Sequence, residues 1–175
     1  MKRIYTIGLT VLLTIAFTGC KELDLAPENT FTDLTYWTSQ SKARSVLNTA
    51  YSQMMSSGYY FYNEALSDNA YNGRGDNQGA ASLAAGTYDP SLARLKEEWN
   101  FHYEGIKTCN ILLANIDRIA DIDEETLNVM KAEARFLRAY QHFQLMTWWG
   151  DVPLIDEDVD IETALTLSRT PKAQV

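Results

Sequence analysis

The sequence lacks an apolar run long enough to cross a membrane. Its longest run, residues 4–17, is broken by Thr6, Thr10 and Thr14, whereas a spanning helix needs about 20 consecutive residues that are mostly apolar. The run follows two cations at the N-terminus, as in a signal peptide. We therefore expect residues 1–19 to be a removable leader.

Cysteine is scarce, with two residues in the chain. Cys20 follows Thr18-Gly19 at the end of the apolar run, and this ending resembles a lipoprotein cleavage site in which Phe17 stands where leucine is usual. A lipid-modified Cys20 would carry more than one acyl chain, which stable anchoring requires. A buried or disulfide-bonded Cys20 fits less well, because a mature N-terminus has no core around it. We expect Cys109, on the apolar stripe of a predicted helix, to be a small buried hydrophobe.

The chain has no excess of basic residues. Without residues 1–19 it retains 13 basic and 23 acidic residues, a formal net charge of −10. This argues against nucleic acid as a partner, because phosphate binding needs a concentrated basic surface. It leaves neutral ligands such as sugars open. A hydrophobic content of 46% is enough for one globular core.

No segment shows sustained alternation of apolar and polar residues, so an all-α fold of long helical hairpins is predicted. Apolar residues at steps of three and four predict a helix over about 39–57, which Gly58 ends. We expect three regions: the leader 1–19, a lipidated N-terminus and extended lead-in over 20–38, and a helical domain over 39–175.

Two longer helices follow in the sequence. One keeps helical spacing for about seven turns and is polar on its other face; its apolar positions are Leu95, Trp99, Tyr103, Ile106, Cys109, Leu113, Ile116 and Ala120. The next runs over about 124–149, with acidic residues near its N-terminal dipole and with Gly150 and Pro153 after its end. Its apolar residues on one side are Val129, Ala132, Phe136, Ala139, Tyr140, Phe143 and Met146. A short acidic turn should join the two helices as an antiparallel hairpin.

The sequence contains no recognisable catalytic motif and no internal 34-residue repeat. Its two histidines, His102 and His142, both lie on predicted helices. Glu98 precedes His102 by four residues, a spacing that could bind a metal, but no third or fourth ligand accompanies the pair. We therefore predict a protein that is not an enzyme and that needs no metal or cofactor, and keep a surface glycoside hydrolase as the weaker alternative.

Residues 57–93 differ from the rest of the chain. They hold five of the nine glycines and five of the ten tyrosines, and no helical period survives between Asn69 and Gly86. Loops of this length are usually functional or disordered, and the aromatic residues argue against disorder. We predict a long irregular ligand-binding loop.

The middle of this loop mixes an aromatic ring with carboxylates, amides and a guanidinium. A pyranose ring has an apolar face that can lie on tyrosine, and its hydroxyls need donors and acceptors together. The predicted glycan-binding residues are Asp68, Asn69, Tyr71, Asn72 and Arg74. The alternative is structural: Asp, Asn and Gly form turns, and Tyr59, Tyr60, Phe61 and Tyr62 anchor the loop on the core. The spacing of a calcium-binding loop is absent.

Several segments together resemble a known family. The stretch 132–140, then Trp149-Gly150-Asp151-Val152-Pro153-Leu154-Ile155 and Arg169-Thr170-Pro171, looks like the N-terminal signature of the SusD/RagB family of nutrient-uptake proteins. The lipoprotein start, Leu23-Asp24 with Pro27, Thr35-Tyr36-Trp37, and Trp99 to Asn110 agree with it. The resemblance covers essentially the whole chain after the leader.

This resemblance implies a cell-surface lipoprotein of Bacteroidetes-type bacteria. Such proteins bind oligosaccharides or other nutrients above a SusC-like TonB-dependent transporter, are helical with tetratricopeptide-like units, and are not enzymes. By that likeness the chain is anchored in the outer membrane, faces the cell exterior and delivers a glycan to the transporter; alternatively, it is a lid subunit without direct glycan contacts. Trp148 and Trp149 fall in the signature helix, where we expect them in the core. Family proteins are longer, so we expect the helical domain to be incomplete at its C-terminus.

Overall fold

The structure is a computed structural model that describes residues 36–55, 62–71, 73 and 79–175. Residues 37–175 form one compact unit. The helices with defined bounds are α3 (Gln40–Ser52), α5 (Ala80–Ala84), α6 (Ala93–Asn115), the 3₁₀ turn η2 (Ile116–Arg118), α7 (Glu124–Trp149) and α8 (Ile161–Thr166). Among the described residues there is no β-strand, only an isolated bridge between Val152 and Thr170. The all-α prediction is confirmed.

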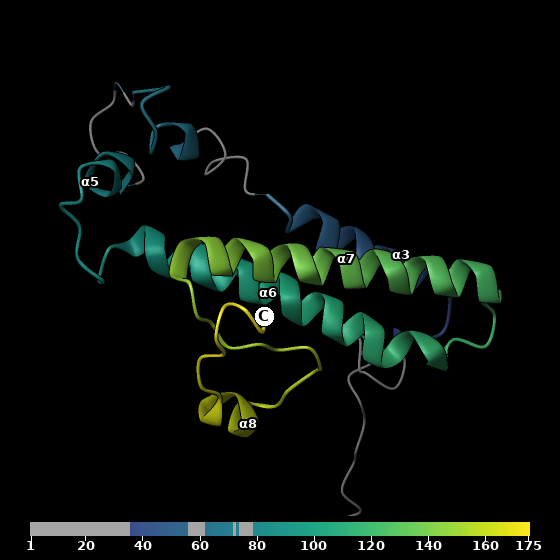
Figure 1. Cartoon of the computed structure of the whole chain (residues 1–175). Coiled ribbons are helices and arrows are strands. Elements are labelled where there is room, and N and C mark those ends of the chain that lie inside the picture. The colour runs from purple at the N-terminus through teal and green to yellow at the C-terminus, as the bar shows by residue number, and fades with distance from the viewer. Residues whose placement is uncertain (1–35, 56–61, 72, 74–78) are drawn as a thin grey trace, which may run out of the picture. The chain divides into compact units, whose positions relative to one another are not determined.

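The long helices α6 and α7 form the predicted antiparallel hairpin, and α3 packs along both (Figure 1). The acidic turn gives α7 its start, because the Asp123 carboxylate accepts a hydrogen bond of 2.8 Å from the backbone N–H of Thr126 and acts as the N-cap. Gly150 ends the helix with a φ of 70°, a left-handed conformation that side chains disfavour. The helix α7 therefore begins and ends where the sequence predicts, at residues 124 and 149.

The core lies between the three helices. From α3 it takes Ala43, Leu47 and Ala50, which are at most 1% exposed. The hairpin contributes the fully or nearly fully buried Ile106, Cys109, Leu112, Ile116, Met130, Ala134, Leu137 and Leu145. Cys109 is a free, buried thiol, and burial raises its pKa to about 11. The prediction of a small buried hydrophobe at this position is confirmed.

The inward sides of α6 and α7 are more polar than the sequence indicates. On α6 the buried residues include Arg94, Glu98 and His102, which belong to the side described above as polar. On α7 they include Gln141 and His142, whereas Phe136, on the apolar side that the spacing picks out, is 64% exposed. The spacing of apolar residues did not identify the buried sides of α6 and α7, because polar side chains occupy several of the buried positions.

Gly105 allows α6 to approach α7 at its centre. A Cβ atom at this position would lie 2.6 Å from Nε2 of Gln141 and 2.8 Å from its Cδ. Gln141 is fully buried and is held at both ends of its amide group, as described below. Residue 105 is therefore glycine because the side chain of Gln141 leaves no room for a Cβ atom, and not because the backbone turns there.

The segment after α7, residues 150–175, folds back along α6, and we call it the C-terminal strap. Asn110 Nδ2 donates to the carbonyl oxygens of Ile155 at 3.2 Å and Glu157 at 2.7 Å. Arg138 donates to Oδ1 of Asn110 at 2.7 Å and to the carbonyl oxygen of Asp156. These side chains give the strap's backbone the partners that a strand or helix would otherwise supply.

His142 and Tyr103 hold the strap at two further points. His142 Nδ1 lies 3.0 Å from the carbonyl oxygen of Arg138, so it carries the proton, and Nε2 accepts the backbone N–H of Ile155 at 3.3 Å. Burial lowers the pKa of His142. The Tyr103 hydroxyl donates to the carbonyl oxygen of Pro153 at 2.9 Å, and burial raises its pKa.

The long loop is partly helical, which the sequence did not indicate. The five-residue helix α5 lies within the stretch where no helical period was found, and the strap likewise contains the unpredicted α8. Both helices are very short, so they give almost no periodic signal. The predicted anchors Tyr59, Tyr60 and Phe61 lie outside the described residues, and Tyr62 is partly buried.

Candidate functional site

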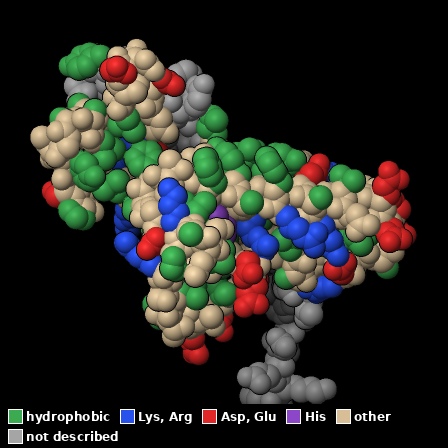
Figure 2. Space-filling view, in the orientation of Figure 1, with side chains coloured by type: hydrophobic (Ala, Val, Ile, Leu, Met, Phe, Trp, Pro, Cys, Tyr) green, Lys and Arg blue, Asp and Glu red, His purple; other side chains and the backbone are tan. Residues whose placement is uncertain are grey.

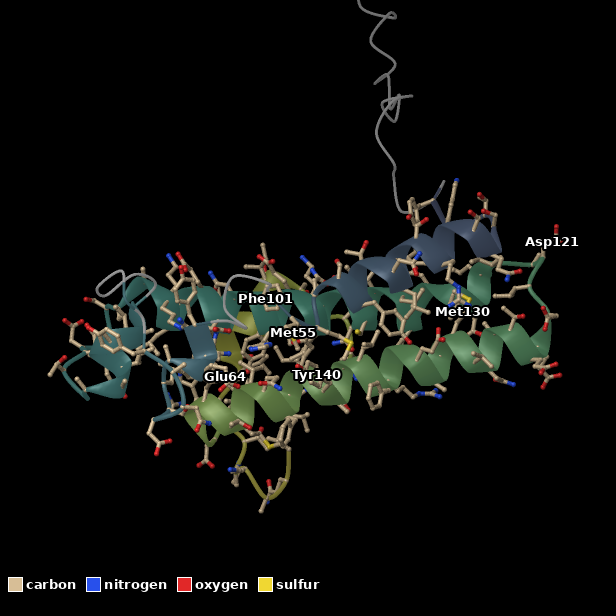
Figure 3. All side chains as sticks on the ribbon, turned by 90° about the horizontal axis from the view of Figure 1, so that it is seen from above. Met55, Glu64, Phe101, Asp121, Met130 and Tyr140 are labelled. Atoms are coloured by element: carbon tan, nitrogen blue, oxygen red, sulfur yellow. The ribbon has the colours of Figure 1, made fainter. Side chains whose placement is uncertain are left out.

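A cavity of about 250 Å³ opens between α6, α7 and the segments that flank the start of the long loop. Its lining comes from four separate parts of the chain: Met54, Met55, Asn63, Glu64, Glu98, Phe101, His102, Tyr140, Gln144 and Trp148. Figure 3 shows Met55, Glu64, Phe101 and Tyr140 converging on this region from their different segments. The cavity therefore exists only once the loop has folded back onto the hairpin.

Helical spacing explains the lining from α6 and α7. Tyr140, Gln144 and Trp148 follow each other at steps of four along α7 and so share one face. On α6, Glu98, Phe101 and His102 share a face for the same reason. Because the hairpin is antiparallel, these two faces lie opposite each other and the three aromatic rings border one space.

A continuous chain of polar groups, most of them buried, reaches the cavity through Asn63, Glu98 and His102, which belong to its lining. Arg94 Nη2 donates to Oδ1 of Asn63 and lies 3.4 Å from Oε1 of Glu98. Glu98 Oε2 lies 3.6 Å from Nε2 of His102. Arg94, Glu98 and His102 are each at most 4% exposed. Such a network fixes the positions of its members, because each buried charge needs its partner.

The chain of polar groups continues into α7 and to the end of α3. His102 Nδ1 lies 2.6 Å from Oε1 of Gln141, and Gln141 Nε2 donates to the carbonyl oxygen of Gln53 at 2.6 Å. Because an amide oxygen only accepts, Nδ1 of His102 carries the proton. The network thus joins Gln53, just before the loop, to Asn63 inside it and Arg94 just after it.

This arrangement can hold a polar ligand that has an apolar face. Phe101, Tyr140 and Trp148 are half-buried, so each keeps some ring surface for contact, while Glu64 and Gln144 can exchange hydrogen bonds with hydroxyl groups. The volume lies just below the range of about 300–1,000 Å³ for common ligand pockets. A cavity of this volume can hold one ring-sized unit of a ligand but not a long ligand chain.

A second cavity of about 230 Å³ lies between α6 and the C-terminal strap. Its exposed lining is mostly apolar and includes Tyr103, Ile106 and Ala164. It offers one aromatic ring, against three in the first cavity. The first cavity is the stronger candidate for a ligand with many hydroxyl groups.

The three predicted glycan-binding residues that the structure describes lie outside the lining of the cavity. Asp68, Asn69 and Tyr71 are exposed, Tyr71 by 86%, and none of the three lines it. The backbone N–H of Asn69 donates to the Ser67 hydroxyl at 3.2 Å, which is turn chemistry. Asn72, Arg74 and the expected lipid-bearing Cys20 lie outside the described residues.

Sequence reasoning missed Phe101, Tyr140 and Trp148 as candidate contacts. Trp149 does pack against the core cluster of Ile106, Leu145 and Val152, as expected, with its ring edge-on to Trp99 at 5.2 Å. Trp148 instead lines the cavity, so its assignment to the core was wrong. A rotation of about 100° per helical residue points adjacent tryptophans to different sides, and this signal could have separated them.

Within the described residues no helix is long and apolar enough to span a membrane. In the same part of the chain, no group of three or more His, Cys, Asp or Glu side chains is arranged to hold a metal ion. Glu98 and His102 take part in the buried network described above.

Comparison with known proteins identifies the family. Residues 22–174 match the SusD-like family model described as starch-binding and associating with the outer membrane. SusD-like protein P25 of Formosa agariphila is 26% identical over 96% of this chain, and SusD-like protein P2 of the same organism is 25% identical over all of it. The chain spans 34% and 35% of these two curated relatives.

Solved structures agree with this assignment. A SusD-like carbohydrate binding protein of Bacteroides fragilis matches 80% of this chain with a TM-score of 0.70 and 31% identity, and this chain covers 29% of it. A second SusD-like protein of that species, 21% identical with a TM-score of 0.68 over 82% of this chain, supports the fold. Since the family model matches residues 22–174 of the 175-residue chain, the protein belongs to the SusD-like family.

Proposed function

We propose that this protein is a carbohydrate-binding lipoprotein of the bacterial outer membrane, and that the cavity between α6 and α7 binds one sugar unit of a glycan. The observation that carries the proposal is the lining of that cavity, where three aromatic rings face carboxylate, amide and imidazole groups. The description of the family as starch-binding and the carbohydrate binding relative of B. fragilis support it.

The chemistry of a pyranose matches this lining. Its C–H face packs on an aromatic ring, and its hydroxyl groups both donate and accept hydrogen bonds. Glu98 and His102 are held in place by the buried network, so they offer fixed groups in the lining of the cavity, whereas Glu64 is exposed at the rim. Fixed polar groups lower the cost of ordering on binding.

The loop residues remain candidates for a second contact outside the cavity. A glycan of several units would extend beyond a cavity of this size, and the exposed ring of Tyr71 is available to it. In this proposal Asp68, Asn69, Tyr71, Asn72 and Arg74 bind the following sugar units with lower individual affinity. We assign binding without hydrolysis to the cavity and to the loop residues.

The proposal includes delivery of the glycan to a SusC-like TonB-dependent transporter. It rests on the expected lipid at Cys20 and on the family's description as associating with the outer membrane. A lipid at residue 20 would tether the chain to the membrane, and surface exposure would put the cavity within reach of extracellular polysaccharide.

Electrophoresis through gels that contain a panel of polysaccharides tests the binding function. Made without its leader and with Cys20→Ser, the chain should be retarded by at least one neutral glycan, and Phe101→Ala should lose most of that retardation. Tyr88→Ala is the matched control, because Tyr88 is 48% exposed and lies outside the cavity.

Three other outcomes would overturn the proposal or part of it. Co-purification of a transporter without retardation by any glycan would favour a lid subunit. Release of soluble sugar by the purified chain would mean that it is a hydrolase. Retardation that Tyr71→Ala abolishes and Phe101→Ala leaves unchanged would place the site in the loop alone.

A further inference from the structure

Two buried side chains in the lining of the cavity between α6 and α7 face each other with acceptor atoms. His102 Nδ1 donates its proton to Oε1 of Gln141, 2.6 Å away, so in the neutral imidazole Nε2 is an acceptor. That atom lies 3.6 Å from Oε2 of Glu98, and a carboxylate oxygen also only accepts. Glu98 and His102 are each 4% exposed. The two acceptors therefore need a donor between them.

The neighbouring contacts fix this arrangement. The amide group of Gln141 cannot turn around, because its Nε2 donates to the carbonyl oxygen of Gln53 at 2.6 Å. Arg94 lies at the other oxygen of Glu98, with Nη2 at 3.4 Å from Oε1. Among the described residues, neither Nε2 of His102 nor Oε2 of Glu98 has a hydrogen-bond donor. Because a buried acceptor without a donor is costly, a ligand that supplies donors at this point gains affinity.

An ammonium group meets this need better than a hydroxyl group. It has three N–H donors and can bond to both acceptors at once, whereas a hydroxyl has one donor and leaves one acceptor unsatisfied. The gap of 3.6 Å between the acceptors lets one nitrogen lie within about 3 Å of both. The positive charge also strengthens the bond to a carboxylate.

The aromatic part of the lining favours a cation as well. The ring of Phe101 lies 5.6 Å from the imidazole ring of His102, centroid to centroid, so it is close to the two acceptors. Tyr140 and Trp148 border the same cavity. The face of an aromatic ring attracts a cation within about 6 Å of its centroid. The same rings can therefore contact the C–H face of a sugar and attract an ammonium group on it.

The distribution of charge in the cavity points the same way. Its described lining contains two carboxylates, Glu64 and Glu98, and no lysine or arginine. Arg94, outside the lining, offsets the charge of Glu98, and Glu64 adds a further negative charge at the rim. On the surface, by contrast, Figure 2 shows groups of basic as well as acidic side chains on one face. A preference for a cation is therefore a property of the cavity and not of the whole surface.

We propose that the sugar unit bound in this cavity is an amino sugar, a pyranose whose ammonium group donates to Glu98 and His102. This inference rests on the proposed function, because it names the class of sugar for the same cavity. The sugar ring packs on the aromatic residues, as a neutral pyranose would. A uronic acid binds weakly, because its carboxylate is repelled by Glu64 and Glu98.

Titrations with single sugar units test the inference without the general attraction of a polycation to an acidic protein. Methyl glucoside, its 2-amino and 6-amino derivatives and methyl glucuronide are each added to the lipid-free chain at about pH 7, where such amines are largely protonated. The indole N–H signals in NMR spectra report binding. At least one amino derivative should bind roughly tenfold more tightly than methyl glucoside, and the glucuronide should bind most weakly. Added salt should reduce the preference.

Glu64→Gln tests the contribution of the carboxylate at the rim. It should lower the ratio of the amino-sugar affinity to the methyl glucoside affinity by roughly two- to fivefold, the size expected for an exposed charge. Glu104→Gln is the matched control, because Glu104 is exposed on α6, lies outside the lining and gives the same change in net charge. A ratio that stays unchanged in Glu64→Gln, or falls equally in both variants, would overturn the inference.

Two further outcomes would overturn the inference and leave the proposed carbohydrate site in place. One is that neither amino derivative binds more tightly than methyl glucoside. The other is a doubly protonated His102 in the ligand-free chain at the same pH, seen in its ¹⁵N chemical shifts, because the two acceptors would then already share a hydrogen. If no sugar bound and no polysaccharide retarded the chain, the proposed function would fail together with the inference.

Discussion

Gly105 faces the side chain of Gln141 at the centre of the contact between α6 and α7. Alanine is favoured over glycine inside a helix by about 1 kcal/mol, so Gly105→Ala would ordinarily stabilise the protein. Here the added Cβ would lie 2.6 Å from Nε2 of Gln141, and Gln141 cannot move without giving up its bonds to His102 and Gln53. The clash should outweigh the gain in helix propensity.

We therefore expect Gly105→Ala to lower the free energy of unfolding by about 1–3 kcal/mol, the usual cost of overpacking a core. In a Gln141→Ala background the same substitution should raise it, because the obstructing atoms are gone. Urea denaturation of the four proteins of this double-mutant cycle measures the coupling. A stabilising effect of Gly105→Ala in the otherwise unchanged chain would contradict this account of α6 packing.

His142 makes the attachment of the C-terminal strap sensitive to pH. Burial holds the pKa of the folded imidazole below its ordinary value of 6.5. As the pH falls through about 6.5 the unfolded chain binds a proton that the folded chain does not, so folded stability decreases with acidification. Protonation would also remove the Nε2 acceptor of the Ile155 N–H.

The expected result is a loss of unfolding free energy between pH 7.5 and 5.5 that is smaller in His142→Asn, which has no titrating group at this position. Denaturation curves at several pH values for both proteins give this difference. Parallel pH profiles for the two proteins would show that His142 does not contribute.

At the scale of elements, the C-terminal strap depends on Asn110. This side chain is 2% exposed, donates to two strap carbonyl groups and accepts from Arg138. Asn110→Ala would remove the donor of these two part-buried hydrogen bonds and the acceptor of the bond from Arg138, at a cost of about 1–3 kcal/mol in all. It should also make the strap cleavable by proteases in the native protein.

Asn115→Ala is the matched control, because Asn115 is half-buried and, among the described residues, its side chain bonds to the neighbouring Ile111 and Arg118. Limited proteolysis and urea denaturation should separate the two variants clearly. If they were equally stable and equally resistant to cleavage, Asn110 would not be the residue that holds the strap.

Long helices with a regular spacing of apolar residues could be predicted from the sequence. Very short helices, and helix sides that bury polar residues, could not. The bounds 124–149 of α7 follow from an acidic start, a sustained period and a terminal Gly150. By contrast α5 and α8 have five and six residues, too few for a period to show. The inward sides of α6 and α7 escaped prediction because Arg94, Gln141 and His142 look like surface residues until their partners are known.

The family signature has a structural meaning at this scale. Gly150 ends α7, Val152 packs in the core and bridges to Thr170, and the backbone N–H of Lys172 donates to the Asp151 carboxylate at 2.8 Å. Two of these contacts therefore join the start of the strap to its end, and the packing of Val152 on Ile106 and Leu145 attaches the strap to the hairpin. These residues indicate the fold more directly than they indicate a ligand.

At the scale of the whole molecule, the candidate site combines residues that are distant in the sequence. Met54 and Trp148 border the same cavity although they belong to segments that are far apart in the sequence. Sequence reasoning selected the loop because its composition suits a carbohydrate, and that proposal remains open for Tyr71 and its neighbours. It could not place Phe101 and Tyr140 together, because their meeting depends on the antiparallel pairing of two helices.

A calorimetric titration of the lipid-free chain with the oligosaccharide that retards it most tests directly whether the cavity between α6 and α7 is the carbohydrate site. Trp148→Ala should weaken binding by roughly tenfold or more, about 1.4 kcal/mol, because it removes an aromatic face from the cavity. Tyr88→Ala should bind as the unchanged chain does. Unaltered affinity of Trp148→Ala, with its fold intact by circular dichroism, would contradict the assignment of this cavity as the carbohydrate site.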